Sequence, residues 1–357
     1  GAQLALLRHI RSLDKSKFEP VVVIGQGGPM GERFRQINNI RVYELKFPRL
    51  KVFDLFLPFS LFYAALKLVL LIRKENPELL VANTERAFYL GVLVNFVMRR
   101  RLILMVRDFE FSRGLFRLLD PWVENYLCVS EKIKNFYKFP KEKSRVVYVG
   151  SDLMEKLKTV SAEEVASIKN SLAIKPGTLT VGFVGRLIEW KGPRLLLDVF
   201  WSLVKEGLES PIYLIIVGEG PMRAELENEV IRRGLSNQVR LAGQVDDVEV
   251  WYNIFDVFAH ASVAPEPFAT TLVEASLAGL PVVATDNGGT GELIIDGENG
   301  LLASPTADSL RAALRRLLSD STLRKDLGEA ARAKALEAFT ERAVTQHCEE
   351  CYEKFII

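Results

Sequence analysis

The chain has 357 residues, and 48% of them are hydrophobic, which suits two packed cores rather than one. Its three cysteines are too few for a small domain held together by disulfides. The net charge of +2 hides an asymmetry, because residues 1–150 hold 26 Lys and Arg against 14 Asp and Glu. This basic half suits an anionic partner or membrane surface, or else is an ordinary solvated face.

The chain opens on a helical pattern at Gln3–Leu13, where an α/β domain ordinarily has a strand. We therefore expect the first strand of the N-terminal domain to be missing. No basic segment leads into an apolar stretch after Gly1, so the sequence predicts no secretory signal. Together with the few cysteines, this indicates a reducing, cytoplasmic location.

An apolar, aromatic segment runs from Leu55 to Ile72, but Pro58 and Lys67 interrupt it, so a membrane-spanning helix is not expected. The segment and its surroundings carry the aromatic residues Phe53, Phe56, Phe59, Phe62 and Tyr63. These fit either a surface that seats a lipid or a growing polysaccharide at a membrane, or a core helix with buried aromatics. The core helix is the expectation that we adopt.

Short β-branched runs alternate with helix-length amphipathic segments, which is typical of parallel sheets covered by helices on both faces. In residues 1–155 the expected strands are Pro20–Ile24, Arg41–Leu45, Leu79–Val81, Leu102–Val106, Tyr126–Val129 and Arg145–Tyr148. In residues 156–338 they are Leu179–Val184, Tyr213–Val217, Val239–Leu241, Val257–Ala259, Val282–Ala284 and Gly300–Leu302. The sequence therefore predicts two Rossmann-like α/β domains, followed by a C-terminal helix in residues 339–357.

Candidate ligand-binding residues follow the expected strands of the second domain. Arg186 and Lys191 lie between a strand and the next helix, where anions bind in open α/β sheets, although most such pairs are solvated surface. Glu266 and Glu274 flank and enter a helix that begins near Ala269, so both reach a ligand at its N-terminus. This spacing also arises by chance in many helices.

Two glycine turns and a pair of cysteines complete the candidate features. The turns at Val217–Pro221 and Asp286–Glu292 allow close backbone approach to a ligand, or else are simply tight strand-to-helix turns. Neither is a dinucleotide fingerprint or a phosphate-binding P-loop. Cys348 and Cys351 have no second Cys or His pair, so they indicate one face of a helix rather than a zinc site.

Four of these motifs, in this order, resemble the large retaining GT-B group called glycosyltransferase family 4: Phe183–Gly192, Val217–Pro221, Glu266–Ala275 and Gly288–Glu292. The likeness covers the whole chain, because family segments also resemble Gly1–Gln3, Pro77–Asn83, Val129–Ser130 and Tyr148–Asp152. It implies two Rossmann-like domains that face each other across a cleft. It also implies that the C-terminal helix packs back on the N-terminal, acceptor-binding domain.

The resemblance implies roles for individual residues. Arg186 and Lys191 would bind the donor diphosphate, Glu266 would contact the transferred sugar, and all three would assist catalysis. Glu274 would bind the ribose. The other donor-binding residues that it implies are Gly185, Gly218, Glu219, Phe268, Ala269, Thr270 and Thr271. It implies no metal and no separate cofactor, because cations and a helix dipole neutralise the diphosphate.

The chain departs from the family pattern at two places. Ala269 stands where the family has a glycine after its Glu-Pro-Phe motif. Arg107 and Asp108 stand where the family often has a histidine in the N-terminal domain, so we expect Asp108 or Arg107 to supply its catalytic assistance. Arg107 and Gly1 are assigned to the acceptor side.

The sequence thus predicts a metal-independent, retaining hexosyl- or related glycosyltransferase. It would move a sugar from a nucleotide-sugar to a glycan or lipid-linked acceptor in the synthesis of a surface polysaccharide or glycoconjugate, with no nucleic acid involved. The expected location is the cytoplasm, on the inner face of an anionic membrane. The alternatives are a catalytically silent nucleotide-sugar-binding subunit and a nucleotide-sugar 2-epimerase.

Overall fold

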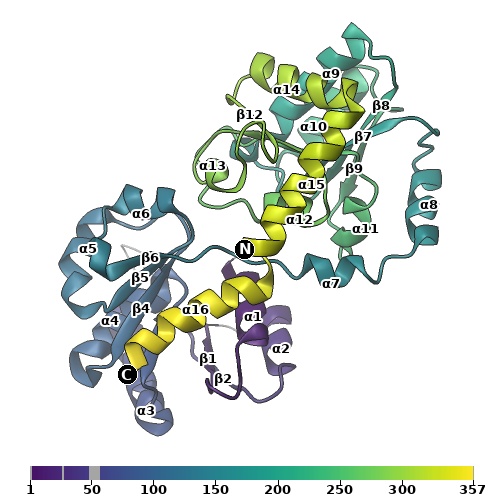
Figure 1. Cartoon of the computed structure of the whole chain (residues 1–357). Coiled ribbons are helices and arrows are strands. Elements are labelled where there is room, and N and C mark those ends of the chain that lie inside the picture. The colour runs from purple at the N-terminus through teal and green to yellow at the C-terminus, as the bar shows by residue number, and fades with distance from the viewer. Residues whose placement is uncertain (1, 26–27, 48–56, 357) are drawn as a thin grey trace. The chain divides into compact units, whose positions relative to one another are not determined.

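The fold is known from a computed structural model, which describes residues 2–25, 28–47 and 57–356. The chain divides into two compact units, and Figure 1 follows it through both. Unit 1 comprises Gly1–Gly150 and Glu341–Ile357, and unit 2 comprises Ser151–Thr340. The boundaries expected from the sequence lie at residues 155 and 338, whereas the contacts within the chain divide it after residues 150 and 340.

Unit 1 is an α/β unit with parallel strands. Its strands are β1 (Val21–Ile24), β2 (Arg41–Glu44), β3 (Leu79–Ala82), β4 (Arg101–Val106), β5 (Asn125–Cys128) and β6 (Ser144–Val146). Its helices are α1 (Ala2–Ser12), α2 (Pro29–Arg35), α3 (Leu57–Glu75), α4 (Glu85–Met98), α5 (Arg113–Leu119), α6 (Glu131–Tyr137) and α16 (Glu341–Ile356), with short 3-10 helices at Asp120–Trp122 and Lys141–Lys143. Among the described residues, β1 and β2 form one sheet and β3-β4-β5-β6 another.

Helix α16 packs into the core of unit 1. Cys348 and Cys351 are both buried there, in a cluster that includes Leu13, Met105 and Val147. Burial raises the pKa of the Cys348 thiol to about 12, so that thiol is neutral near pH 7. The three-residue spacing of the two cysteines therefore places both side chains on the apolar face of one helix.

Unit 2 contains a single parallel sheet covered by helices. Its strands are β7 (Leu179–Val184), β8 (Ile212–Val217), β9 (Val239–Gly243), β10 (Val257–His260), β11 (Val282–Thr285) and β12 (Leu301–Ala303). Its helices are α7 (Leu153–Leu157), α8 (Ala162–Ser171), α9 (Pro193–Glu206), α10 (Arg223–Arg232), α11 (Val248–Tyr252), α12 (Thr270–Leu277), α13 (Thr290–Leu293), α14 (Ala307–Ser319) and α15 (Ser321–Ala338), with a 3-10 helix at Glu189–Lys191.

The strand order of this sheet is β12-β11-β10-β7-β8-β9. The chain builds outward from β7 to β9 and then returns to the other side of β7 with β10. In open parallel sheets a ligand crevice forms where the order reverses, beyond the carboxyl ends of the strands. The ends of β7 and β10 are therefore where a ligand site of unit 2 is expected.

The strand predictions from the sequence are confirmed. Each of the twelve expected strands forms, and each begins and ends within two residues of its expected bounds. The central strands β4, β8 and β10 are buried almost throughout, as expected for strands that are covered on both faces. Buried, β-branched runs between turn residues identify such strands reliably, because their apolar character does not depend on which neighbour they pair with.

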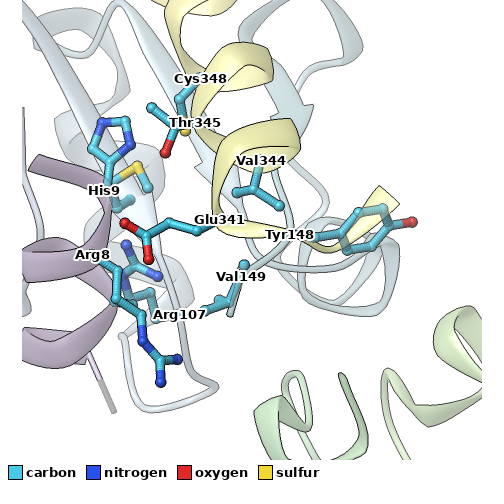
Figure 2. Close-up of a pocket in the computed structure, with 12 residues that line it drawn as sticks. Arg8, His9, Arg107, Tyr148, Val149, Glu341, Val344, Thr345 and Cys348 are labelled. Atoms are coloured by element: carbon cyan, nitrogen blue, oxygen red, sulfur yellow. The ribbon is translucent and has the colours of Figure 1, made fainter. Parts of the chain in front are cut away.

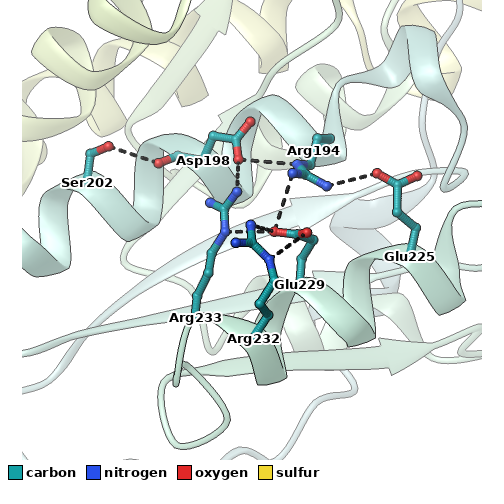
Figure 3. Close-up of polar contacts among 7 residues, drawn as sticks. All are labelled: Arg194, Asp198, Ser202, Glu225, Glu229, Arg232 and Arg233. Carbon is teal, nitrogen blue, oxygen red and sulfur yellow. Dashed lines mark hydrogen bonds and ion pairs between the residues drawn. The ribbon is translucent and has the colours of Figure 1, made fainter.

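A network of ion pairs on the surface of unit 2 joins α9 to α10 (Figure 3). Glu229 contacts three guanidinium groups, those of Arg194, Arg232 and Arg233. Arg233 also reaches Asp198 on α9, with Nη2 and Oδ1 2.5 Å apart. The hydrogen bond from Arg232 and the neighbouring charges lower the pKa of Glu229 to about 2. The network holds α10 against α9.

The expected burial of the aromatic segment is wrong. Phe59, Phe62 and Tyr63 of α3 are all exposed, whereas Phe53 and Phe56 lie outside the described residues. The core face of α3 consists instead of smaller or aliphatic side chains such as Ala64 and Ile72. Of the helices that the structure describes, none combines the length and the apolar character needed to cross a membrane.

Candidate functional site

The loops after β7 and β10 bring two of the predicted residues into direct contact. Lys191 lies in the 3-10 helix after β7, and Glu266 lies in the loop between β10 and α12. Lys191 Nζ and Glu266 Oε2 are 2.5 Å apart, and Glu266 is almost fully buried. The ammonium group also lies over the Trp190 ring, 4.4 Å from its centroid. A cation and an anion thus meet where the strand order reverses.

Two further polar side chains surround the Glu266 carboxylate. Ser262 donates its hydroxyl to Glu266 Oε2 over 3.1 Å, and His260 Nε2 lies 3.5 Å from the same oxygen. Burial by itself raises the pKa of Glu266, but the contacts with His260 and Lys191 outweigh it and lower that pKa to about 2. Burial also lowers the pKa of His260. Glu266 is therefore an anion beside a neutral imidazole.

A glycine in the neighbouring turn positions the Glu266 backbone. Gly289 N–H donates to the Glu266 carbonyl over 2.7 Å, and Glu266 pairs with Gly288 as an isolated bridge. Gly288 has φ 78°, and a Cβ built there would lie 2.1 Å from the Glu266 carbonyl oxygen. Only glycine fits such a position without displacement of the carboxylate loop. The Gly288–Glu292 motif therefore supports the site rather than merely ending a strand.

Helix α12 begins directly after the Glu266 loop without a capping side chain. Ala269 occupies the N-cap position, and Thr270 and Thr271 form the first turn. First-turn N–H groups have no acceptor within their own helix and attract anions. Phe268 is buried, and its ring lies 6.0 Å from that of Phe339. Phe268 and Ala269 are buried and fix the position of this helix N-terminus, so the first-turn N–H groups are also fixed in position.

Glu274 lies in the second turn of α12 and is held by hydroxyl groups of unit 2. Tyr252 donates to Glu274 Oε2 over 3.1 Å, and Ser151 donates to Oε1 over 3.3 Å. The side chain is buried. Both carboxylate oxygens accordingly have a fixed orientation, which is a property of residues that position a ligand.

The remaining predicted residues lie at the ends of β7 and β8. The backbones of Gly185 and Gly218 lie close together, since a Cβ built on Gly218 would be 1.9 Å from the Gly185 carbonyl oxygen. Gly218 also has φ 139°. Arg186 is exposed and has no ion pair with a described residue. Glu219 forms an ion pair with Arg223 on α10. Of the two charged residues here, Glu219 therefore has an ion-pair partner and Arg186 has none among the described residues.

Sequence reasoning did not assign Ser151 to this site. It also missed three further residues: Tyr252, His260 and Ser262. His260 ends β10, and Ser262 follows two residues later, so their position at a strand end was a usable signal. Tyr252 ends α11, far from Glu274 in the sequence, and carried no such signal. The structure brings all three to Glu266 or Glu274.

Unit 1 has a separate pocket between α1, the end of β4 and the start of α16 (Figure 2). Arg8, His9, Arg107 and Glu341 line it, and the side chains of Arg107 and Glu341 extend toward the same space. Burial lowers the pKa of His9 to about 3, so His9 is neutral near pH 7. The pocket therefore contains two guanidinium groups and one carboxylate.

The predicted residues of the N-terminal half belong to unit 1. Arg107 lines this pocket, and its Nε donates to Asn83 Oδ1 over 2.9 Å. Asp108 follows it, and burial raises the pKa of the Asp108 carboxyl group. A raised pKa suits a group that exchanges a proton during a reaction. Gly1 lies outside the described residues.

Among the described residues, no three His, Cys, Asp or Glu side chains are grouped so that they could hold a metal ion. In unit 2, Lys191 and Glu266 instead form an ion pair between the loops that follow β7 and β10. Cationic side chains and first-turn helix N–H groups are the groups that bind anionic ligands in proteins.

Comparison with known proteins adds a family match. The model of the family described as "Glycosyl transferases group 1" matches residues 164–334, which lie within unit 2. The lipopolysaccharide core biosynthesis glycosyltransferase LpsE of Rhizobium meliloti is 26% identical over 97% of this chain and 93% of its own. The uncharacterized glycosyltransferase MJ1069 of Methanocaldococcus jannaschii is 25% identical over 70% of this chain and 63% of its own, so the match spans less than two thirds of that relative.

A solved structure has the same fold. The crystal structure of Anabaena Alr3699/HepE in complex with UDP and glucose superposes with a TM-score of 0.82 at 24% identity. The match covers 99% of this chain and 96% of that one. The predicted GT-B fold of the whole chain is thereby confirmed.

Proposed function

Because residues 164–334 form a glycosyl transferases group 1 domain in a chain with the GT-B fold, we propose that unit 2 binds a nucleotide-sugar and that the chain transfers its sugar with retention of configuration. The proposed acceptor is a glycan or a lipid-linked sugar in the synthesis of a surface polysaccharide. The likeness to LpsE and to the capsular polysaccharide glycosyltransferase CapM of Staphylococcus aureus supports this assignment. The proposed location is the cytoplasmic face of an anionic membrane.

The observation that carries the proposal is the contact between Lys191 and Glu266 beside the uncapped N-terminus of α12. A nucleoside diphosphate sugar carries two negative phosphates next to a polyhydroxylated ring. Lys191, Arg186 and the α12 N–H groups suit the phosphates, and the Glu266 carboxylate suits hydroxyl donors of the sugar. Glu274, oriented by Tyr252 and Ser151, suits the ribose hydroxyl groups.

The proposed reaction exchanges two bonds on one face of the sugar. The bond between the anomeric carbon and the diphosphate oxygen breaks, and the acceptor oxygen bonds to the same carbon from the same side. The acceptor proton passes to the departing diphosphate. The cations of unit 2 stabilise the negative charge that grows on the leaving group, which is the electrostatic contribution that enzymes commonly make largest.

Unit 1 is the proposed site of the acceptor. The pocket lined by Arg8 and Arg107 suits an anionic acceptor group, and Asp108 is proposed to supply the catalytic assistance that the family's N-terminal histidine gives. The pocket's Glu341 carboxylate lies among these cations and so competes with such an anion. No metal and no separate cofactor enters the proposed mechanism.

Donor binding and slow donor hydrolysis test the proposal. UDP-, GDP- and ADP-sugars are titrated by calorimetry with EDTA present, beginning with UDP-glucose because the HepE crystals contain UDP and glucose. The variants are Lys191→Ala and Glu274→Ala. Lys205→Ala is the matched control, since Lys205 also lies over a tryptophan ring, at 3.8 Å, but on the far part of α9.

The expected result is binding and turnover of one donor without metal, lost in both site variants and kept in the control. If the chain binds a donor but never turns it over, even with lipid-linked acceptors, it is a silent binding subunit instead. Release of free nucleotide with a rearranged sugar identifies an epimerase. Absence of binding to every nucleotide-sugar refutes the proposed donor site.

A further inference from the structure

Helix α3 carries a stripe of exposed apolar side chains. Phe59 is 76% exposed and Phe62 is 70% exposed, and Tyr63, Leu66 and Leu70 follow on the same face. The spacing of three and four residues gives one continuous stripe along the helix. Water-exposed aromatic side chains in such a row cost free energy, so a stripe of this kind marks a binding surface rather than an ordinary solvated face.

The neighbouring helix α4 has a second exposed apolar stripe. It consists of Leu93, Phe96 and Val97, of which Val97 is 67% exposed. The two helices pack against each other through a shared cluster that includes Ala64, Ile72, Leu90 and Val94. We call the eight exposed apolar residues of both stripes the α3–α4 surface: Phe59, Phe62, Tyr63, Leu66, Leu70, Leu93, Phe96 and Val97.

Basic residues outnumber acidic ones around the α3–α4 surface: residues 57–101 hold seven Lys and Arg against three glutamates, Glu75, Glu78 and Glu85. Residues 57–74 and 86–101 contain no Asp or Glu. The basic residues in these two segments are Lys67, Arg73, Lys74, Arg86, Arg99, Arg100 and Arg101. Lys67 Nζ lies 4.5 Å from the centroid of the exposed Tyr63 ring, so cationic and aromatic groups are in direct contact. The surface thus combines apolar groups with an excess of positive charge.

From this combination we infer that the α3–α4 surface docks on the anionic face of a lipid bilayer. The aromatic rings insert at the level of the headgroups, and the surrounding Lys and Arg bind lipid phosphates. A second copy of the chain fits less well, because a two-fold interface would bring together two surfaces that each carry an excess of cations. The inference deepens the proposed function, on which it rests, by naming the surface that brings unit 1 to a lipid-linked acceptor.

Vesicle co-sedimentation tests the inference with the full chain. The probes are vesicles of phosphatidylcholine alone and of phosphatidylcholine mixed with phosphatidylglycerol. The wild-type chain is expected to bind the mixed vesicles, to bind the neutral ones at least about tenfold more weakly, and to lose binding as salt rises. A triple variant, Phe59→Ser with Phe62→Ser and Tyr63→Ser, is expected to bind the mixed vesicles about tenfold or more weakly than wild type.

Ile231→Ser is the matched control, because Ile231 is an equally exposed apolar residue on α10 of unit 2. It should leave vesicle binding unchanged. Circular dichroism and the thermal midpoint show whether each variant folds, and donor titration shows whether unit 2 is intact. Undiminished vesicle binding by the folded triple variant overturns the inference, as does loss of self-association instead of vesicle binding. Absence of donor binding in wild type and in both variants refutes the proposed function, but the vesicle result still tests whether the α3–α4 surface binds a membrane.

Discussion

The candidate site of unit 2 and helix α3 of unit 1 differ in the burial of their characteristic side chains. In unit 2 the two carboxylates of the candidate site, those of Glu266 and Glu274, are buried and bonded within the chain, as Glu266 is to Lys191. In unit 1 the aromatic and basic side chains of the α3–α4 surface are exposed, as Phe62 and Lys67 are on α3. A buried pair is expensive to disturb, since either partner left alone is an unpaired charge. An exposed side chain contributes to association rather than to folding.

The difference predicts where substitutions act. Substitutions in the candidate site of unit 2 should change both stability and chemistry, because the same contacts serve both. Substitutions on the α3–α4 surface should change neither stability nor donor binding. Five variants or conditions test this contrast, in order of decreasing expected effect.

Lys191→Ala has the largest expected effect. It leaves Glu266 buried without its cation, and it removes charge stabilisation from the leaving diphosphate. We expect a fall in kcat of about 10²–10³ and a loss of about 3–5 kcal/mol in the free energy of unfolding. Urea unfolding and steady-state kinetics measure the two. A normal kcat in a destabilised variant would limit Lys191 to a structural role.

Gly288→Ala should disturb the Glu266 loop through the backbone. Its Cβ would lie 2.1 Å from the Glu266 carbonyl oxygen. Gly297→Ala is the matched control, because Gly297 has a similar φ of 75° but open space around its Cβ. We expect Gly288→Ala to cost about 2 kcal/mol more in unfolding free energy than the control, and to weaken donor binding. Equal costs would mean that the loop moves freely.

Tyr252→Phe removes the hydroxyl that donates to Glu274 Oε2 and that also lies 3.5 Å from the Thr271 carbonyl oxygen. The expected loss is about 1.5 kcal/mol of unfolding free energy, with a donor Kd raised up to about tenfold. Tyr213→Phe, on β8, serves as the control for the loss of a phenol hydroxyl from a largely buried tyrosine. A donor Kd that rises equally in both variants would show that Glu274 needs no orientation by Tyr252.

Acid should weaken unit 2 through Glu266. Its pKa is about 2 in the folded chain and near 4.5 in the unfolded one, so between these values the unfolded chain binds more protons. The stabilisation by the ionised carboxylate is therefore complete above about pH 4.5 and is lost as the pH falls toward 2. Thermal midpoints measured over this range should fall less steeply in Glu266→Gln than in wild type. Parallel curves would contradict the assigned pairing.

Phe62→Ala should have the smallest effect on stability. An exposed side chain loses little on unfolding, so we expect a change within about 0.5 kcal/mol. Phe88→Ala in the same unit should cost about 3–5 kcal/mol, because Phe88 is fully buried. Chemical unfolding of both variants makes the comparison. A large loss in Phe62→Ala would mean that its ring is buried against unit 1.

The fold was largely predictable from local patterns. Strands such as β8 and β10 are continuous apolar runs bounded by turn residues, so both their existence and their ends are visible in the sequence. The burial of α3 was not predictable, because it has apolar residues on all sides. Periodicity alone does not say which face of such a helix meets the core. The contacts of Ala64 and Ile72 decide that.

The candidate site was predictable in part. The sequence by itself determined which residues follow strands β7 and β10, since these positions depend only on local pattern and turn chemistry. Only the tertiary structure decided that Lys191 meets Glu266, that His260 and Ser262 join them, and that Tyr252 orients Glu274. These contacts join residues from different loops. The loops meet because β10 lies beside β7 in the sheet, and no single segment of the sequence determines that strand order.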